Sequence, residues 1–409
     1  NGTFLLCAAL PACVGLYQQK TTSMRNKLSI VALLAFTALL TITGCKKELL
    51  VPQAIEVAGE INTDSVWQHR ENATVDYIVS GSVFINAKLT IRAGTIIQLK
   101  ENASLFVNND GMLSAIGEPG RRITITAVPG SKWGSIVFYS ESDTNRLYNC
   151  DISHGGKESL VTPGAMVVVG QNSYAEGKVA IRDCVLEASA GHGLYINDRS
   201  KVNYFYNNAF NNNTGYPITV TTENVSDINS TATFNANGKN YVEIRDCVFP
   251  TGEGQTLTKL AVDYYIQETV TFHGYDTIKQ GVVVKFSSNG GLRVDDIGGI
   301  TGYMYIQGTS AQPVTFEGGQ GSWKGIFISG NGVHTIENAV IKDAGSTANV
   351  YGQQAGVAVE SQSSYVSIRD CVFDNSGGYG IDLGGNTNYN SDIETANTFT
   401  SCAMGAVKY

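Results

Sequence analysis

From about residue 54 onward, apolar residues alternate with small polar ones in short runs, which is the two-residue period of β-strands. The runs at 89–92 (LTIR) and 123–126 (ITIT) show this pattern, and Gly, Asn or Asp residues separate such runs from one another. No window after residue 60 has the apolar spacing of an amphipathic helix of ordinary length. The pattern therefore predicts a chain that is nearly all β.

The strand pattern itself repeats along the chain. Ile-Arg-Asp-Cys-Val occurs at 181–185, 244–248 and 368–372, and its first and last copies lie 187 residues apart. The same shift aligns the tripeptide at 75–77 with the identical tripeptide at 262–264. We therefore predict two tandem copies of a unit of 187 residues, a first half over 54–239 and a second half over 240–409.

A shorter repeat lies inside each half, since 181–186 aligns with 205–210 at a shift of 24 residues. Short strands separated by Asn, Asp or Gly turns at this period fit one coil of a three-faced parallel β-helix. Inward side chains should stack on those of the next coil at about 4.8 Å; the candidates are Ile181, Cys184, Leu186, Leu194 and Ile196. Turn residues that tolerate a left-handed backbone and can bond to the next coil recur at Asn149, Asp183, Asn207, Asn338 and Asp370.

Three further features belong to the same scaffold. Longer spacings predict protruding loops near 155–164 and 345–356, at the same place in both halves. The segment 61–76 is the expected N-terminal cap, with Trp67 covering the first coil. Trp133 and Trp323 occupy equivalent places before a strand, which favours a packing role over a platform for sugar rings.

The N-terminal region predicts export and a lipid anchor. Met24 starts a short basic segment, an apolar run follows at 28–40, and Gly44 precedes Cys45. This arrangement resembles a bacterial lipobox, so we expect a lipoprotein signal peptide over 24–44, lipidation at Cys45 and a polar tether over 45–53. Residues 1–23 match no targeting pattern and are interpreted as an over-extended N-terminus. The alternative is an ordinary cleaved signal followed by an unrelated cysteine.

The charge and the spacing of the cysteines limit the classes of partner and metal site that the chain is expected to have. The chain has 28 basic and 36 acidic residues, a net charge of −8, and cleavage before Cys45 would leave 25 basic against 36 acidic residues. An acidic surface without a basic stripe argues against a nucleic-acid partner. Besides Cys45, the mature chain has five widely spaced cysteines and no CxxC, which predicts neither a zinc site nor a disulfide framework: Cys150, Cys184, Cys247, Cys371 and Cys402.

From about residue 55 to its end, the chain resembles the right-handed parallel β-helix (pectin-lyase-like) lipoproteins of Bacteroidetes-type bacteria. The segments that carry the resemblance occur in the family's order, at 89–97 (LTIRAGTII), 132–134 (KWG), 150–156 (CDISHGG) and 397–400 (NTFT). The resemblance implies an all-β right-handed parallel β-helix and a location in the cell envelope. Family members of this kind mostly lack a defined activity.

The candidate binding residues are His154, Lys157 and Glu158, on the first-half loop, with His192 and Tyr216 stacked on successive coils. We single out the three loop residues because the second half offers no evident counterpart for them. A column of aromatic and imidazole faces could pack against sugar rings, or could simply fill a turn position, as Tyr379 would in the second half.

These features predict an exported protein, lipid-anchored on the outer membrane, that binds a polysaccharide or an envelope partner without catalysis. No catalytic residue, metal site or cofactor is assigned, and the oligomeric state is left open. The alternative is a polysaccharide lyase or glycoside hydrolase on the same fold. A lyase would need Ca²⁺ and a base, for which Asp151, Asp183 and Arg182 are the nearest candidates. A purely structural role as a spacer is a third possibility.

Overall fold

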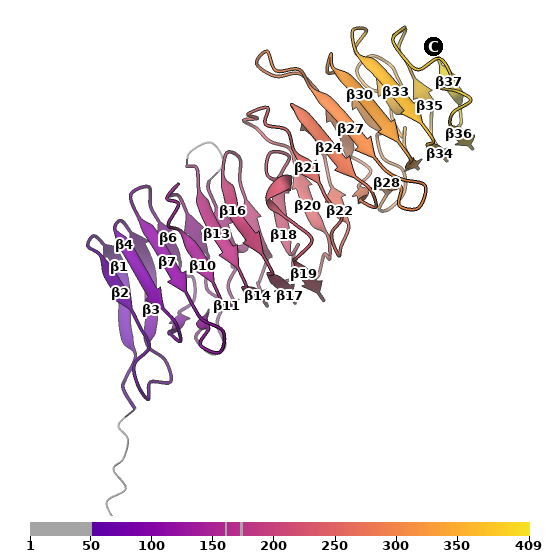
Figure 1. Cartoon of the computed structure of the whole chain (residues 1–409). Coiled ribbons are helices and arrows are strands. Elements are labelled where there is room, and N and C mark those ends of the chain that lie inside the picture. The colour runs from indigo at the N-terminus through magenta and orange to yellow at the C-terminus, as the bar shows by residue number, and fades with distance from the viewer. Residues whose placement is uncertain (1–50, 160–161, 172–174) are drawn as a thin grey trace, which may run out of the picture. The chain divides into compact units, whose positions relative to one another are not determined.

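The computed structural model describes residues 51–159, 162–171 and 175–409 (Figure 1). Residues 51–409 form one compact unit. The predicted signal peptide, Cys45 and most of the tether lie outside the described residues.

Short strands in four sheets make up this unit. The first sheet contains β2 (Ser65–Trp67), β4 (Lys88–Arg92), β7 (Met112–Ile116), β10 (Arg146–Tyr148), β13 (Lys178–Arg182) and β16 (Lys201–Tyr206). The second contains β21 (Thr256–Leu257), β24 (Tyr275–Lys279), β27 (Tyr303–Gln307), β30 (Val333–Glu337) and β33 (Tyr365–Arg369). The third contains β23 (Thr269–Phe272), β26 (Gly291–Val294), β29 (Ile326–Ile328), β32 (Ala355–Val359), β35 (Tyr379–Asp382) and β37 (Gly405–Lys408).

The fourth and largest sheet has 20 strands and runs through both halves. Its first-half strands are β1 (Ile55–Ile61), β3 (Tyr77–Ile85), β5 (Ile96–Leu99), β6 (Leu105–Val107), β8 (Ile123–Ala127), β9 (Ile136–Phe138), β11 (Cys150–Ser153), β12 (Ala165–Val169), β14 (Val185–Glu187), β15 (His192–Ile196), β17 (Ala209–Asn211), β18 (Ile218–Thr221) and β19 (Thr233–Asn235). The others are β20 (Val242–Arg245), β22 (Tyr264–Ile266), β25 (Val283–Phe286), β28 (Val314–Gly318), β31 (Ala339–Lys342), β34 (Val372–Asp374) and β36 (Thr398–Thr400).

The pairing pattern is that of a parallel β-helix, which confirms the predicted fold class. Strand β4 pairs in parallel with β7, which pairs with β10, so the chain returns to the same face after three strands. In the coils around residues 181–210 this return takes the predicted 24 residues, as where the Cys184 N–H donates to Asn208 Oδ1. The tandem duplication remains a prediction from the sequence.

The core consists of the inward side chains of successive coils. All five inward positions predicted between 181 and 196 are at most 1% exposed. Ile181 pairs with Phe205, Leu186 with Phe210 and Leu194 with Ile218. Stacked columns of apolar side chains thus replace the single central core of a globular domain.

The predicted turn residues take the left-handed conformation. Asn149, Asp183, Asn207, Asn338 and Asp370 all have φ between 49° and 54°. Asn and Asp tolerate this region better than other side chains with a Cβ. The Asn207 amide donates to Asp183 Oδ1 on the preceding coil at 2.8 Å, so these residues also link coils.

Each of the three tryptophans packs in the interior. Trp67 is 5% exposed, belongs to β2 and stacks on the Tyr77 ring at 4.9 Å, so the predicted cap is built into the first coil as an edge strand. Trp133 and Trp323 are fully buried, and their Nε1–H groups donate to the Ser153 and Lys342 carbonyl oxygens. The packing role predicted for the latter two is confirmed.

The sheets change where the two predicted halves meet. The first sheet ends at β16 and the second begins at β21, while β20 pairs with both β18 and β22. The 3₁₀ helix η1 (Val225–Asp227) contacts both β16 and β21. Asp227 accepts the Val202 N–H at 2.8 Å, so a side chain covers part of the open edge of β16.

Candidate functional site

His154 is a turn residue. Its backbone φ is 61°, and its Nδ1 lies 3.0 Å from Ser153 Oγ. Asp343 has φ 59° directly after β31, just as His154 directly follows β11. The expectation that His154 has no counterpart in the second half is therefore wrong at the level of the backbone, since both positions need a residue that tolerates this conformation.

Lys157 and Glu158 follow on the same segment. Lys157 Nζ forms an ion pair with Glu101 Oε1 at 2.6 Å, and this contact lowers the pKa of Glu101. Glu158 is exposed. The His192 N–H donates to the Gly164 carbonyl at the end of this loop at 2.6 Å, but among the described residues no hydrogen bond, ion pair or ring contact joins the side chains of His154, Lys157 or Glu158 to His192 or Tyr216. The predicted binding residues thus fall into two separate groups.

His192 and Tyr216 form the second group, and their predicted stacking is confirmed. Their ring centroids lie 5.5 Å apart with an angle of 9° between the planes, and the Tyr216 N–H donates to His192 Nδ1 at 3.2 Å. Burial, together with the charges of Lys239 and Arg245, lowers the pKa of His192 to about 4. Because Nδ1 accepts a hydrogen bond and the ring is neutral at pH 7, His192 is held as a packing partner of Tyr216.

A groove of about 420 Å³ opens beside this stack, and we call it the tyrosine groove. Its lining residues are Tyr216, Lys239, Tyr241, Tyr265, Gln267, Glu268, Ser287, Ser288, Asn289, Gly319 and Gln320. Tyr265 lies 6.1 Å from Tyr216 and 5.6 Å from Tyr241, measured between ring centroids. Tyr216 is only 3% exposed, whereas Tyr241 and Tyr265 are half-buried. The latter two offer the accessible ring faces.

Strand register places Tyr265, which lines the groove, in a row of outward side chains. Thr219 of β18 pairs with Glu243 of β20, which pairs with Tyr265 of β22, and Tyr265 pairs with Lys285 of β25. These side chains share the outward face because the inward positions on either side carry the core. Four coils therefore contribute one neighbouring side chain each.

Charged groups lie close to the tyrosine rings. Lys239 Nζ lies 4.5 Å from the Tyr216 ring centroid, and Lys285 Nζ lies 5.7 Å from that of Tyr241. Glu243 is 7% exposed and accepts a hydrogen bond from Thr219 Oγ1 at 3.0 Å. Burial raises the pKa of Glu243, although hydrogen bonding from Thr219 and the Lys239 charge oppose the shift.

The groove can bind a ligand that has both apolar faces and hydroxyl groups. Aromatic rings pack well against flat apolar surfaces, and a few polar groups then fix the orientation of a ligand. Here the polar groups are the side chains of Gln267, Asn289 and Gln320, with the hydroxyls of Ser287 and Ser288.

The side chains required by the lyase alternative are engaged elsewhere. Arg122 Nε forms an ion pair with Asp151 at 2.7 Å, and Arg182 Nε lies 3.1 Å from Asp183 Oδ2. Asp183 occupies one of the left-handed turns. In the ranges that the structure describes, no three His, Cys, Asp or Glu side chains are grouped as metal ligands. These contacts do not form the calcium site that the lyase alternative would need.

The cysteines behave as core residues. Cys150, Cys184 and Cys371 are at most 1% exposed, and none of the three forms a disulfide. Burial raises the pKa of Cys371 to about 12, which leaves its thiol protonated at pH 7. Cys45, the predicted lipidation site, lies outside the described residues. The described part of the chain contains no helix with the length and apolar character needed to cross a membrane.

Sequence reasoning found Tyr216 but missed Tyr241, Tyr265, Lys239 and Lys285. Tyr265 and Lys285 stand at polar-face positions of strands, which is the available signal in the sequence. That signal says only that a side chain points outward; it does not say which coil lies beside it.

Comparisons with protein families, with curated proteins and with solved structures found no match.

Proposed function

We propose that this chain is an exported, lipid-anchored protein of the cell envelope that binds a glycan, without catalysis, in the tyrosine groove. The observation that carries the proposal is the pair of accessible rings, Tyr241 and Tyr265, beside a wall of amide and hydroxyl side chains. The anchor at Cys45 and the outer-membrane location rest on the sequence pattern at 24–45.

The binding proposal is tested with the mature full-length protein on a panel of polysaccharides, by affinity electrophoresis and then calorimetry. Tyr241→Ala and Tyr265→Ala should each weaken binding by about tenfold or more, since each removes a stacking face. Tyr275→Ala is the matched control, because Tyr275 is 59% exposed and stacks on Tyr303 at 4.2 Å on another strand. Absence of retention on any polysaccharide, or equal losses in all three variants, would contradict the proposal.

The anchor is tested separately by detergent phase partitioning after expression in a Gram-negative host. The wild-type protein should enter the detergent phase, and Cys45→Ser should move it to the aqueous phase, because the acylated thiol is lost. Cys402→Ser is the control, since Cys402 lies half-buried in the last coils. If Cys45→Ser stays in the detergent phase, the lipoprotein assignment fails while glycan binding can still hold.

The lyase or hydrolase alternative has no observation among the described residues in its favour. Its test remains an absorbance screen on uronate polymers, with and without Ca²⁺.

A further inference from the structure

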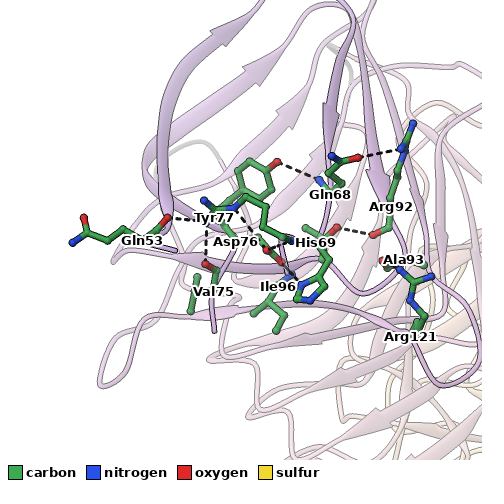
Figure 2. Close-up of polar contacts among 12 residues, drawn as sticks. Gln53, Gln68, His69, Val75, Asp76, Tyr77, Arg92, Ala93, Ile96 and Arg121 are labelled. Atoms are coloured by element: carbon green, nitrogen blue, oxygen red, sulfur yellow. Dashed lines mark hydrogen bonds and ion pairs between the residues drawn. The ribbon is translucent and has the colours of Figure 1, made fainter. Parts of the chain in front are cut away.

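A second site lies at the N-terminal end of the solenoid, far along the chain from the tyrosine groove. Asp76, directly before β3, is fully buried, and its carboxylate accepts the N–H groups of Arg70 at 2.7 Å and Ile96 at 2.8 Å. His69 Nδ1 lies 3.1 Å from Asp76 Oδ2 (Figure 2). The two backbone donors fix the carboxylate, so the carboxylate in turn orients the imidazole.

The orientation of His69 leaves its second ring nitrogen available. Nδ1 is the atom that meets Asp76, and among the described residues Nε2 has no hydrogen-bond partner. The His69 side chain is 38% exposed, whereas the carboxylate behind it is completely covered. Because Asp76 contacts Nδ1 and Nε2 has no partner among the described residues, the orientation of the His69 ring is fixed.

The imidazole opens onto a pocket of about 450 Å³ lined by His69, Gly94, Ile96, Gly120, Arg121, Arg122 and Thr124. Two guanidinium groups, one imidazole and one hydroxyl line it, and none of its described lining residues is acidic. A Cβ built on Gly94 would lie 3.7 Å from Arg121 Nε and 3.8 Å from His69 Cβ. These are ordinary van der Waals distances, and the φ of 82° at Gly94 is what favours glycine at this position.

The arginines keep unused donors. Arg121 is 62% exposed; one nitrogen donates to the Ala93 carbonyl at 3.2 Å and another lies 3.5 Å from Glu118. Figure 2 shows Arg121 and Ala93 beside the His69 ring. Arg122 donates through Nε to Asp151 and through Nη2 to the Cys150 and Asp183 carbonyl oxygens, which fixes its guanidinium group and leaves Nη1 as its unused nitrogen among the described contacts. Guanidinium groups with free N–H donors match the geometry of oxyanions.

From these contacts we infer that the pocket formed by His69, Arg121 and Arg122 binds an oxyanion, either a free phosphate ion or a phosphate group carried on a larger molecule. In a chain with a net charge of −8, this pocket gathers two guanidinium groups and one imidazole, each of which also contacts a carboxylate (Asp76, Glu118 or Asp151) outside the lining. Arg121 supplies N–H donors, His69 presents Nε2, and Thr124 adds a hydroxyl. This site is independent of the glycan groove.

The test is an NMR titration of the mature protein with inorganic phosphate, following the imidazole signals. The His69 signals should shift and saturate, while those of His154, which does not line the pocket, should stay constant. Arg121→Gln should weaken phosphate binding by about tenfold, since one charge-assisted contact is lost. His69→Asn retains a donor to Asp76, so it should remain folded and also bind more weakly, as measured by calorimetry.

Arg92→Gln is the matched control. Arg92 lies on neighbouring β4, donates to Gln68 Oε1 at 3.0 Å and does not line this pocket. Equal loss of affinity in Arg92→Gln and Arg121→Gln would overturn the site, as would an identical shift with chloride at the same ionic strength, or no saturable shift at all. Methyl phosphate distinguishes the two sources: equal affinity supports a group on a larger molecule, and binding of inorganic phosphate alone supports the free ion.

Discussion

Single buried polar side chains affect the stability of this interior. Asp276 points inward from β24, is fully buried, and leaves Oδ2 without a partner among the described residues. Its Oδ1 accepts only the Gln255 N–H at 2.8 Å. Burial, with a smaller contribution from Glu223, raises the pKa of Asp276 to about 8. At neutral pH the fold keeps this group protonated whereas the unfolded chain ionises it, so this aspartate destabilises the fold.

Asp276→Asn should therefore stabilise the protein above pH 5. The folded protein holds this proton up to about pH 8, whereas the unfolded chain releases it near pH 3.9. The stability that Asp276 contributes is therefore fully present below about pH 4 and is lost as the pH rises toward 8. The variant should lose this slope and gain on the order of 2–4 kcal/mol at pH 8, as measured by urea unfolding at pH 5 and pH 8.

Asp110→Asn is the control, because Asp110 is an exposed carboxylate in a turn. An unchanged pH slope in Asp276→Asn would show that the buried carboxyl is already neutralised by an interaction of another kind.

Strands and turns in this chain are held by side chains as well as by sheet pairing. Asn213 is 1% exposed, and its Oδ1 accepts the Ser189 N–H at 3.1 Å. Its amide donates to Leu186 O at 3.2 Å and to Asn237 Oδ1 at 2.9 Å on the next coil. The sequence predicted the column of left-handed turn residues but did not predict this buried asparagine. An asparagine at a turn gives no sign of whether its side chain points into the interior or toward solvent.

Replacing Asn213 by Ala should weaken the first half. The change leaves the Ser189 N–H and the Leu186 carbonyl without these partners, and each unsatisfied buried group costs about 1–3 kcal/mol. We expect a loss of about 2–4 kcal/mol in guanidinium unfolding monitored by circular dichroism. Asn235→Ala, at an exposed position of β19, should change stability little. Equal losses of stability in Asn213→Ala and Asn235→Ala would contradict a stabilising role for the buried Asn213 hydrogen bonds.

Over the whole solenoid, continuity of the sheets decides how stability is distributed. Each coil contacts only its neighbours, so an interrupted face weakens the chain locally. The interruption lies at η1, where β16 and β21 belong to different sheets while β20 continues the large sheet. The sequence repeats predicted a boundary near residue 240. They could not show on which face of the solenoid the strand pairing is interrupted, since that depends on how coils of unequal length stack.

Hydrogen exchange should reveal this weaker region. Backbone amides in η1 and β21 should exchange faster than those in β24 and β27, because β21 is the edge strand of its sheet whereas β24 and β27 each have a paired strand on both sides. Mass spectrometry of peptic fragments measures this directly on the mature protein. Uniform protection from β16 to β27 would show that the side-chain contacts of η1 replace the missing strand pairing in full.

The sequence by itself determined the fold class, the inward positions and the left-handed turns, because each depends on patterns within one coil. Alternation with a period of two residues places Ile181 and Leu186 inside, and the short polar side chain of Asp183 suits its turn. Only the tertiary structure decided which outward side chains meet. Tyr216 stacks on Tyr265, and His69 and Arg121 line one pocket, because coils of different lengths stack on one another, so this proximity depends on the accumulated register and not on any local pattern.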